Sequence, residues 1–306
     1  MRRKPFPWHI TVFLAPAVLI YSIFMIYPMV ASLDFSLYRT IEEGKQVFVG
    51  LGNYIKLLTD PLWSQPFWNA FWNNVIFFVV HMSLQNPIGL FLAVLLAANI
   101  RGAWIYRTII FTPTILSVVL IGFAWKLILS PTWGIWFPLL DKLGLGNNEI
   151  AIALLGNEQS ALITLSLISV WQNIGIPMML FLAALIRIPT ELIEAAQVDG
   201  ASSWKIFWKI QFPLIIPTVG IVAILTFIGN FNAFDLIYAT QGALAGPNYS
   251  TDIMGTFFFR TFFGFQLRPG DPNMGATVAG MMLLIILIGV LIYLFGWQRR
   301  MEEVQF

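Results

Sequence analysis

The stretch Glu194–Pro217, EAAQVDGASSWKIFWKIQFPLIIP, is a polar loop in a very apolar chain. Just before it, Pro189-Thr190 supplies a helix start, and Glu191 and Glu194 are expected to place negative charge in the first turn, where the helix dipole favours it. Gly200 is expected to end this helix, because glycine takes the left-handed backbone conformation without strain. The loop is therefore expected to hold a short helix that stops at Gly200.

A second short helix is expected directly afterwards, over residues 204–211. Ser202 or Ser203 can cap its N-terminus, since a hydroxyl oxygen accepts from the free backbone N–H groups there. Lys205 and Lys209 are four residues apart and so share its polar face. The loop thus reads as two short amphipathic helices between long apolar runs.

The composition of the chain is that of a membrane protein. Of its 306 residues, 58% are hydrophobic and 10% are charged, whereas a soluble domain carries about a quarter charged residues. The net charge of +2 is too small to argue for nucleic-acid binding, and the absence of cysteine excludes disulfides and cysteine metal sites. His9 and His81 lie in different segments, so no metal centre is expected. The basic start precedes a run long enough to span a membrane, so no cleavable signal peptide is expected.

Six apolar stretches are long enough to cross a hydrocarbon core, which takes about 20 residues of helix. They contain no Asp, Glu, Arg or Lys except Lys126 at one end. The sequence therefore predicts an all-α membrane protein, with residues 1–306 forming a single transmembrane domain and the polar loop at 187–213. The predicted spans are residues 10–33, 75–98, 108–126, 161–186, 212–234 and 274–297.

Proline lies inside or beside nearly every predicted span. Lipid tolerates this only where neighbouring groups satisfy the carbonyls that proline leaves free. The prolines therefore indicate broken or kinked spans, which occur along transport pathways and also in purely structural helices. They are Pro16, Pro28, Pro87, Pro113, Pro177 and Pro217.

Basic residues predict the orientation of the spans. With six spans, both termini and the loop at 187–213 share one side of the membrane. That side carries ten Lys and Arg residues and the other six, spread over longer loops. By the positive-inside rule both termini are expected to be cytoplasmic. The ten are Arg2, Arg3, Lys4, Arg101, Arg107, Arg187, Lys205, Lys209, Arg299 and Arg300, and the six are Arg39, Lys45, Lys56, Lys142, Arg260 and Arg268.

The outer loops, residues 34–74 and 130–160, are rich in Trp, Phe, Pro and Gly. One interpretation is an aromatic belt at the membrane interface. The other is a landing surface for an extracytoplasmic binding protein. The sequence leaves both open.

Polar side chains inside the spans form three clusters. Amides both donate and accept hydrogen bonds, which suits hydroxyl-rich solutes, and Trp171, Phe231 and Phe234 could stack on the apolar face of a sugar. The alternative is hydrogen bonding between helices. The clusters are Gln172 with Asn173, then Asn230, Asn232 and Asp235, and finally Gln85 with Asn86.

The polar loop carries a family resemblance. Glu194-Ala195-Ala196, followed by Asp199-Gly200 and later by Ile210 and Phe212-Pro213, resembles the EAA loop of binding-protein-dependent ABC importer permeases. Phe212 stands where that family more often has Leu. The resemblance implies that Glu194, Ala195, Ala196, Asp199 and Gly200 couple the chain to an ATPase subunit, with the two alanines allowing close approach.

The resemblance extends over most of the chain. Four further motifs look like the carbohydrate-uptake branch of these permeases, which includes maltose-type and glycerol-3-phosphate-type members. One departure is the motif Gln241–Pro247, which is longer than the usual Thr-x-Gly-Gly-Pro. The matching motifs are Leu51-Gly52-Asn53-Tyr54, Trp171 with Asn173 and Gly175, Phe234–Tyr238, and Gly246-Pro247 with Ser250-Thr251.

What the resemblance implies is one permease subunit of a sugar importer in the inner (plasma) membrane, with the type I ABC importer permease fold. Its solute would be a di- or oligosaccharide or related polyol, and Gln172, Asn173, Asn230, Asn232 and Asp235 would lie on its path. The implied partners are a second, homologous permease, two ATPase subunits and an extracytoplasmic binding protein.

The chain itself has no G-x-x-x-x-G-K-[ST] loop and no catalytic constellation. It is therefore expected to be no enzyme and to hold no cofactor, with ATP and Mg bound by the partner subunit. The alternative is a self-sufficient, ion-coupled secondary transporter, which would need a buried carboxylate at mid-depth. Asp235 is the only candidate for it, and it lies near the end of a span.

Overall fold

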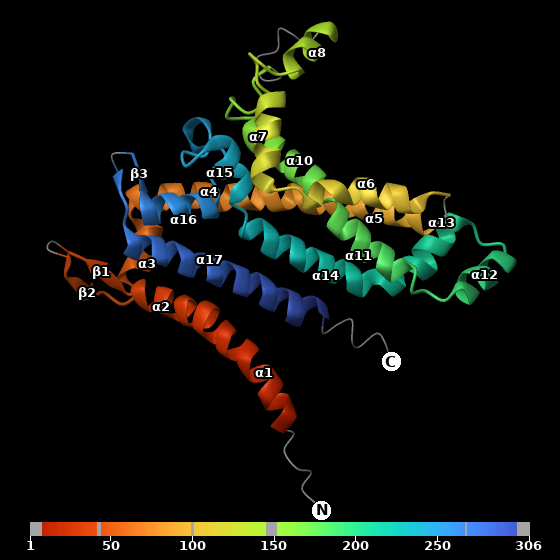
Figure 1. Cartoon of the computed structure of the whole chain (residues 1–306), viewed down its shortest axis with the longest axis horizontal. Coiled ribbons are helices and arrows are strands. Elements are labelled where there is room, and N and C mark those ends of the chain that lie inside the picture. The colour runs from red at the N-terminus through yellow and green to blue at the C-terminus, as the bar shows by residue number, and fades with distance from the viewer. Residues whose placement is uncertain (1–7, 42–43, 99–100, 145–151, 267, 299–306) are drawn as a thin grey trace, which may run out of the picture. The chain divides into compact units, whose positions relative to one another are not determined.

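The computed structural model describes residues 8–41, 44–98, 101–144, 152–266 and 268–298. The chain divides into two compact units, residues 1–64 with 258–283 and residues 65–257 with 284–306. Both units are built mainly of helices, which Figure 1 labels in chain order. The basic residues Arg2, Arg3, Lys4, Arg299 and Arg300, which contribute to the predicted orientation, lie outside the described residues.

The first unit joins the N-terminal helices to the beginning of the last long helix. Two short antiparallel hairpins, β1 with β2 and β3 with β4, are additions to the all-helical expectation. The elements are α1 (Trp8–Tyr21), the π-helical turn η1 (Ser22–Ile26), α2 (Tyr27–Phe35), β1 (Tyr38–Thr40), β2 (Gln46–Phe48), α3 (Gly52–Thr59), β3 (Gly264–Phe265), β4 (Arg268–Pro269) and α17 (Pro272–Ile292), which continues into the second unit.

Two asparagines hold the first unit together. The amide nitrogen of Asn53 donates to the carbonyls of Ser36 and Tyr38, at 2.9 and 2.7 Å. The amide oxygen of Asn273 accepts from the hydroxyl of Thr40 at 2.6 Å. Asn53 belongs to the Leu51–Tyr54 motif, so part of this motif serves to fasten α3 to the segment between α2 and β1.

The second unit contains the remaining helices. In chain order they are α4 (Pro61–Val80, which begins in the first unit), η3 (His81–Gln85), α5 (Asn86–Ala97), α6 (Ala103–Ile115), α7 (Val118–Ile128), α8 (Trp136–Lys142), α10 (Ala161–Asn173), α11 (Gly175–Leu185), α12 (Thr190–Val198), α13 (Ser203–Ile206), η4 (Phe207–Gln211), α14 (Phe212–Phe231), α15 (Asp235–Gln241), η5 (Pro247–Tyr249), α16 (Met254–Phe263, which ends in the first unit) and η6 (Tyr293–Gln298).

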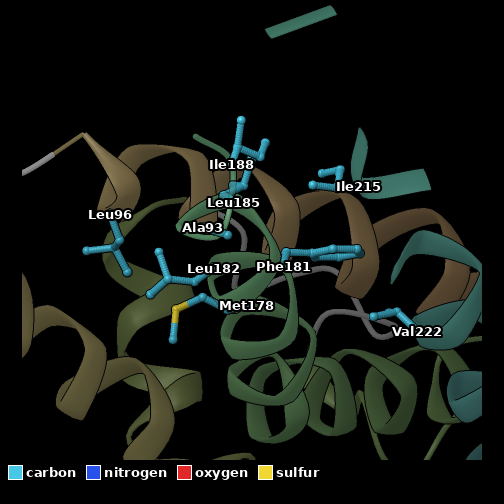
Figure 2. Packing of buried hydrophobic residues seen from close by; sticks show 9 residues of the cluster. All are labelled: Ala93, Leu96, Met178, Phe181, Leu182, Leu185, Ile188, Ile215 and Val222. Carbon is cyan, nitrogen blue, oxygen red and sulfur yellow. The ribbon is translucent and has the colours of Figure 1, made fainter. Parts of the chain in front are cut away.

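One hydrophobic core of the second unit lies between α5, α11 and α14, as Figure 2 shows. Gly89 allows α5 and α11 to approach, because a Cβ at this position would lie 3.0 Å from Cγ of Pro177 and 3.1 Å from the backbone nitrogen of Met178. The cluster contains Ala93, Leu96, Met178, Phe181, Leu182, Leu185, Ile188, Ile215 and Val222.

By length and composition, four continuous helical segments among the described residues can cross a membrane, or six if each of two bent pairs forms one span. The second segment starts at Pro61, well before the predicted residue 75, so residues that were predicted to be loop belong to this helix. The third and fourth predicted spans are the bent pairs, α6 with α7 at 93° and α10 with α11 at 42°. The predicted all-α membrane fold is confirmed, and the segments number six, as predicted, if each bent pair is one span.

The break between α6 and α7 shows how the chain tolerates a turn inside an apolar segment. Pro113 lies in the last turn of α6, and Leu116 and Ser117 are extended. The carbonyl of Leu116 accepts a hydrogen bond from Nε2 of Gln172 at 3.3 Å. The hydroxyl of Thr114 donates to the carbonyl of Gln172 at 2.8 Å. The two breaks therefore satisfy one another's polar backbone groups, as a low-dielectric environment requires.

Candidate functional site

A cavity of about 440 Å³ lies in the second unit, among η3, α10, α14 and α15. This volume is within the range of small-molecule sites, about 300–1,000 Å³. All five residues expected on the solute path line it, and they come from two separate polar clusters of the sequence. They are Gln172, Asn173, Asn230, Asn232 and Asp235.

Helix ends place these side chains around the cavity. Gln172 and Asn173 occupy the last turn of α10, directly before the bend at Ile174. Asn232 caps the C-terminus of α14, and Asp235 begins α15. The polar groups gather where helices end or turn, so the cavity interrupts the apolar packing of the unit.

Backbone carbonyls orient three of the amides. The side-chain nitrogens of Asn173, Asn230 and Asn232 each donate to the carbonyl one helical turn earlier, at 3.0, 2.7 and 3.0 Å. A carbonyl can only accept, so these bonds fix which end of each amide is the nitrogen. Asn232 and Asp235 are exposed, whereas Gln172 and Asn230 are buried.

His81 and Ser169 also line the cavity, and no pattern in the sequence assigned them to it. Nδ1 of His81 lies 2.7 Å from the carbonyl of Phe77, and Nε2 lies 3.0 Å from the hydroxyl of Ser169. Since the carbonyl must accept at Nδ1, both ring nitrogens are engaged. The only signal in the sequence was a lone histidine in an apolar run.

The third polar cluster divides. Gln85 lines the cavity, while Asn86 lies outside its lining and accepts from the hydroxyl of Thr226 at 3.2 Å. Of the three aromatic residues expected beside the path, only Phe234 lines the cavity. Trp171 instead packs edge-on against Trp125. Phe231, the third aromatic residue, is buried against Phe71, Phe78 and Phe227.

Helix α12 and the turn after it have the geometry expected of the polar loop. Gly200 has φ +75°. The N–H of Ala201 donates to the carbonyl of Ala196 at 2.9 Å, and the N–H of Gly200 donates to that of Gln197 at 3.0 Å. This pair of bonds is a Schellman motif, which satisfies carbonyls that a helix end leaves free. The hydroxyl of Ser202 then accepts from the N–H of Lys205 and caps α13.

The loop presents a free surface at one end of the unit. Figure 1 shows α12 at the end where α5 and α11 also end. Val198 is 87% exposed and Trp204 72%. Glu191 lies in the first turn of α12, but Glu194 lies one turn later, so the expectation that Glu194 charges the first turn was wrong. Among the described residues, the exposed carboxylate of Glu194 has no hydrogen-bond or ion-pair partner.

The lengthened motif Gln241–Pro247 forms a turn. Gly242, Ala245 and Gly246 all have positive φ, and Nε2 of Gln241 donates to the carbonyl of Leu155 at 2.8 Å. The following segment is fastened to α4, where the amide of Asn73 donates to the carbonyl of Asp252 at 2.8 Å. The motif therefore has a structural role beside the helices that line the cavity.

Comparisons with known proteins identify related chains. A family model described as "Binding-protein-dependent transport system inner membrane component" matches residues 85–300. The chain is 32% identical to the "Probable ABC transporter permease protein PH1215" of Pyrococcus horikoshii, over 99% of this chain and 100% of that one. It is 30% identical to the "Lactose transport system permease protein LacF" of Rhizobium radiobacter, over 94% of this chain and 93% of that one.

A solved structure has the same fold. It is a chain of a bacterial ABC transporter involved in the import of the acidic polysaccharide alginate. The TM-score is 0.78 at 21% identity, and the match covers 95% of this chain and 96% of that chain.

Proposed function

Because the chain belongs to the family of binding-protein-dependent transport system inner membrane components, we propose that it is the permease subunit of an ABC importer for a sugar or related polyol. It has the type I ABC importer permease fold and is a multi-pass membrane protein. A permease carries solute between its helices and performs no covalent chemistry. We propose that the two compact units act together as one permease domain.

The observation that carries the proposal is the polar cavity. Its amides come from helices far apart in sequence and meet in the part of the unit where α10 ends and α14 ends. Burying polar side chains in lipid-embedded helices is costly unless they pair or serve a function. An amide-lined cavity of about 440 Å³ provides such a function, because sugar hydroxyls can pair with amides on several sides.

The sugar class rests on chemistry and on relatives together. Amide groups bind hydroxyls without requiring a charged partner. The similarity to a lactose transport system permease supports a saccharide as the solute. Phe234 contributes the one aromatic ring of the expected set that faces this space, and such a ring can stack on the apolar face of a sugar.

Coupling to ATP hydrolysis is assigned to α12 and its turn. Exposed Ala195 and half-buried Ala196 leave room for a second protein beside the helix. The Schellman motif at Gly200 gives the loop a defined end, so movement of a docked partner is transmitted to α13 and α14 rather than absorbed. Glu194 and Asp199, both exposed, are available to that partner.

The proposal includes partners and an orientation. A second permease subunit, two ATPase subunits that bind ATP and Mg, and an extracytoplasmic binding protein complete the importer. The chain itself holds no cofactor in this account. The loop at 187–213 and both termini lie in the cytoplasm, in agreement with the excess of Lys and Arg on that side.

Replacing Asn232 with Ala tests the cavity. Within the described part of the chain, the side chain of this exposed residue makes one hydrogen bond, to the carbonyl of Ile228. The variant should assemble normally and lose most ATP-driven uptake of labelled sugar in vesicles. Asn69→Ala is the matched control, because Asn69 is also exposed, bonds one carbonyl, that of Tyr249, and lies outside the cavity lining. If Asn232→Ala, Asn173→Ala and Asp235→Ala all transport normally, the sugar passes through the partner permease instead.

A further inference from the structure

Two buried polar side chains, His81 and Ser169, connect the helical turn η3 to α10. Nδ1 of His81 lies 2.7 Å from the backbone carbonyl of Phe77, which can only accept, so Nδ1 carries the hydrogen. In the neutral ring Nε2 is then an acceptor, and the hydroxyl of Ser169, 3.0 Å away, donates to it. The backbone of α4 therefore sets the direction of the hydrogen bond between the two side chains.

This direction decides what Ser169 can offer to Asn173, which lies one helical turn later in α10. A hydroxyl has one hydrogen and two lone pairs. Because its hydrogen is committed to His81, the oxygen of Ser169 can only accept from a further neighbour. Nδ2 of Asn173 donates to this oxygen at 3.4 Å and to the backbone carbonyl of Ser169 at 3.0 Å. The nitrogen end of the Asn173 amide is therefore turned toward Ser169.

The other end of the amide, the oxygen of Asn173, is left for a solute. Among the described residues this oxygen has no hydrogen-bond partner, and Asn173 is only half-buried where it lines the cavity. It retains accessible surface, whereas the amide oxygen of the neighbouring Gln172 is fully buried. A solute in the cavity can therefore reach Asn173, and it meets a hydrogen-bond acceptor there.

Without His81 the hydroxyl of Ser169 would compete for this acceptor. Its hydrogen would be free to turn toward Asn173, and reversal of the amide would bring the oxygen of Asn173 within reach, because the oxygen and the nitrogen exchange places. The reversed amide would present its NH2 group to the cavity. A donor would then stand where the solute now meets an acceptor.

We infer that His81 is a positioning residue for solute binding. It holds the hydrogen of Ser169 away from Asn173, so that the oxygen of Asn173 faces the cavity and accepts a hydrogen bond from a hydroxyl of the sugar. This inference rests on the proposed sugar import and adds a residue that acts on the path through another. A purely structural His81 would only join two helices, so the two roles differ in what removal of the Ser169 hydroxyl does.

Two amide substitutions of His81 provide the first test. The amide of Gln extends as far as Nε2 and can still accept from Ser169, whereas the amide of Asn extends only as far as Nδ1. The measurement is the initial rate of ATP-driven uptake of labelled maltose, trehalose and lactose by the complete importer in vesicles. Uptake should fall about two- to tenfold in His81→Asn, as expected for one hydrogen bond, and stay close to wild type in His81→Gln. Equal rates of the two variants would overturn the inference.

Removal of the hydroxyl provides the second test. Adding Ser169→Ala to His81→Asn should restore most of the uptake, because no hydroxyl remains to compete for Asn173. Ser83→Ala in the same background is the matched control and should restore nothing, since Ser83 is exposed, bonds the carbonyl of Val79 at 2.6 Å and lies outside the cavity lining. A double variant with His81→Asn and Ser169→Ala that is no faster than His81→Asn alone would contradict the positioning role.

A third variant keeps the test independent of how His81 substitutions fold. Asn173→Ala leaves His81 in place and should reduce uptake by a similar factor of about two to ten. Normal uptake by Asn173→Ala together with impaired uptake by Asn232→Ala would overturn the inference and leave the proposed function standing. Absence of uptake of all three sugars by the wild-type importer would instead contradict the sugar function itself.

Discussion

Replacing Gly200 with Val should uncouple the importer while leaving the membrane-embedded helices intact. Gly200 has φ +75°, and a Cβ built on it meets no atom within 4 Å. The added Cβ therefore meets open space in the part of the chain that the structure describes. Its whole effect is the strain of a β-branched residue in the left-handed region, at the point where α12 must end.

The left-handed conformation costs roughly 1–2 kcal/mol for a residue with a Cβ. A change of this size alters the ratio of two conformations by a factor of about 5 to 30. The valine side chain would favour continuing α12 or redirecting it, which breaks the hydrogen bonds from Ala201 to Ala196 and from residue 200 to Gln197. The population of the loop conformation that can dock the ATPase should therefore fall by a factor of about 5 to 30.

The assay is co-purification of the ATPase together with sugar-stimulated ATP turnover. Both should fall in Gly200→Val, and Gly200→Asn should retain more of each, because asparagine tolerates this region better. Gly144→Val is the control, since Gly144 also has positive φ and open space around its Cβ but follows α8. Normal co-purification and turnover in Gly200→Val would refute the assignment of coupling to this loop.

Further substitutions probe the docking surface, the core and the topology. Ala196→Trp should block close approach of the ATPase and reduce its co-purification, with an unchanged melting temperature of the permease, and undiminished co-purification would argue against docking on α12. Gly89→Val should separate α5 from α11 and destabilise the chain by about 1–3 kcal/mol, the usual cost of overpacking. The measurement is the melting temperature, which should be lower than that of Gly144→Val. Equal melting temperatures of the two variants would contradict the packing of α5 against α11. In a chain without native cysteine, Gln159→Cys should react with an impermeant thiol reagent in intact cells and Ser203→Cys should not, and the reverse pattern would invert the topology.

Local signals in the sequence were sufficient for the polar loop. The structure starts α12 at Thr190, gives Gly200 a positive φ and caps α13 with Ser202. Each of these features depends on residues within a few positions of one another, so sequence spacing contains the information. The charge at Glu194 was misplaced by one turn, because its position depends on which residue begins the helix.

The cavity was predictable only in part. Amides inside apolar spans are conspicuous, and Gln172, Asn173, Asn230 and Asn232 could be singled out one by one. Their gathering around one space depends on the packing of α10 against neighbouring helices, which no local pattern specifies. The sequence did not predict a role for Ser169, because a serine within a helix is not unusual by itself. Its role depends on its hydrogen-bond partner, His81, which is far away in sequence.

The bends within the third and fourth spans also could not be predicted from the sequence. Pro113 indicated a disturbance in the third span. The 93° bend between α6 and α7, however, comes with contacts that are distant in sequence: the hydroxyl of Thr114 donates to the carbonyl of Gln172, and the side chain of Gln172 donates to the carbonyl of Leu116. Similarly, helix α4 extends back to Pro61 through a run rich in Trp and Asn, which was predicted to be loop. Here tertiary contacts outweigh composition, such as those of Asn73 and Asn74 with the segment after α15 and that of Asn74 with Asn230 of α14.

We propose that this chain passes solute only when an ATPase drives it. The most direct measurement is uptake of labelled neutral di- and trisaccharides into vesicles that contain either the purified chain alone or the complete importer with its binding protein. Only the complete importer should take up the sugar, and only when ATP is present on the side that corresponds to the cytoplasm. The Asn232→Ala importer should show much reduced uptake. Uptake by the chain alone, driven by a proton or sodium gradient without ATP, would contradict it and establish a secondary transporter.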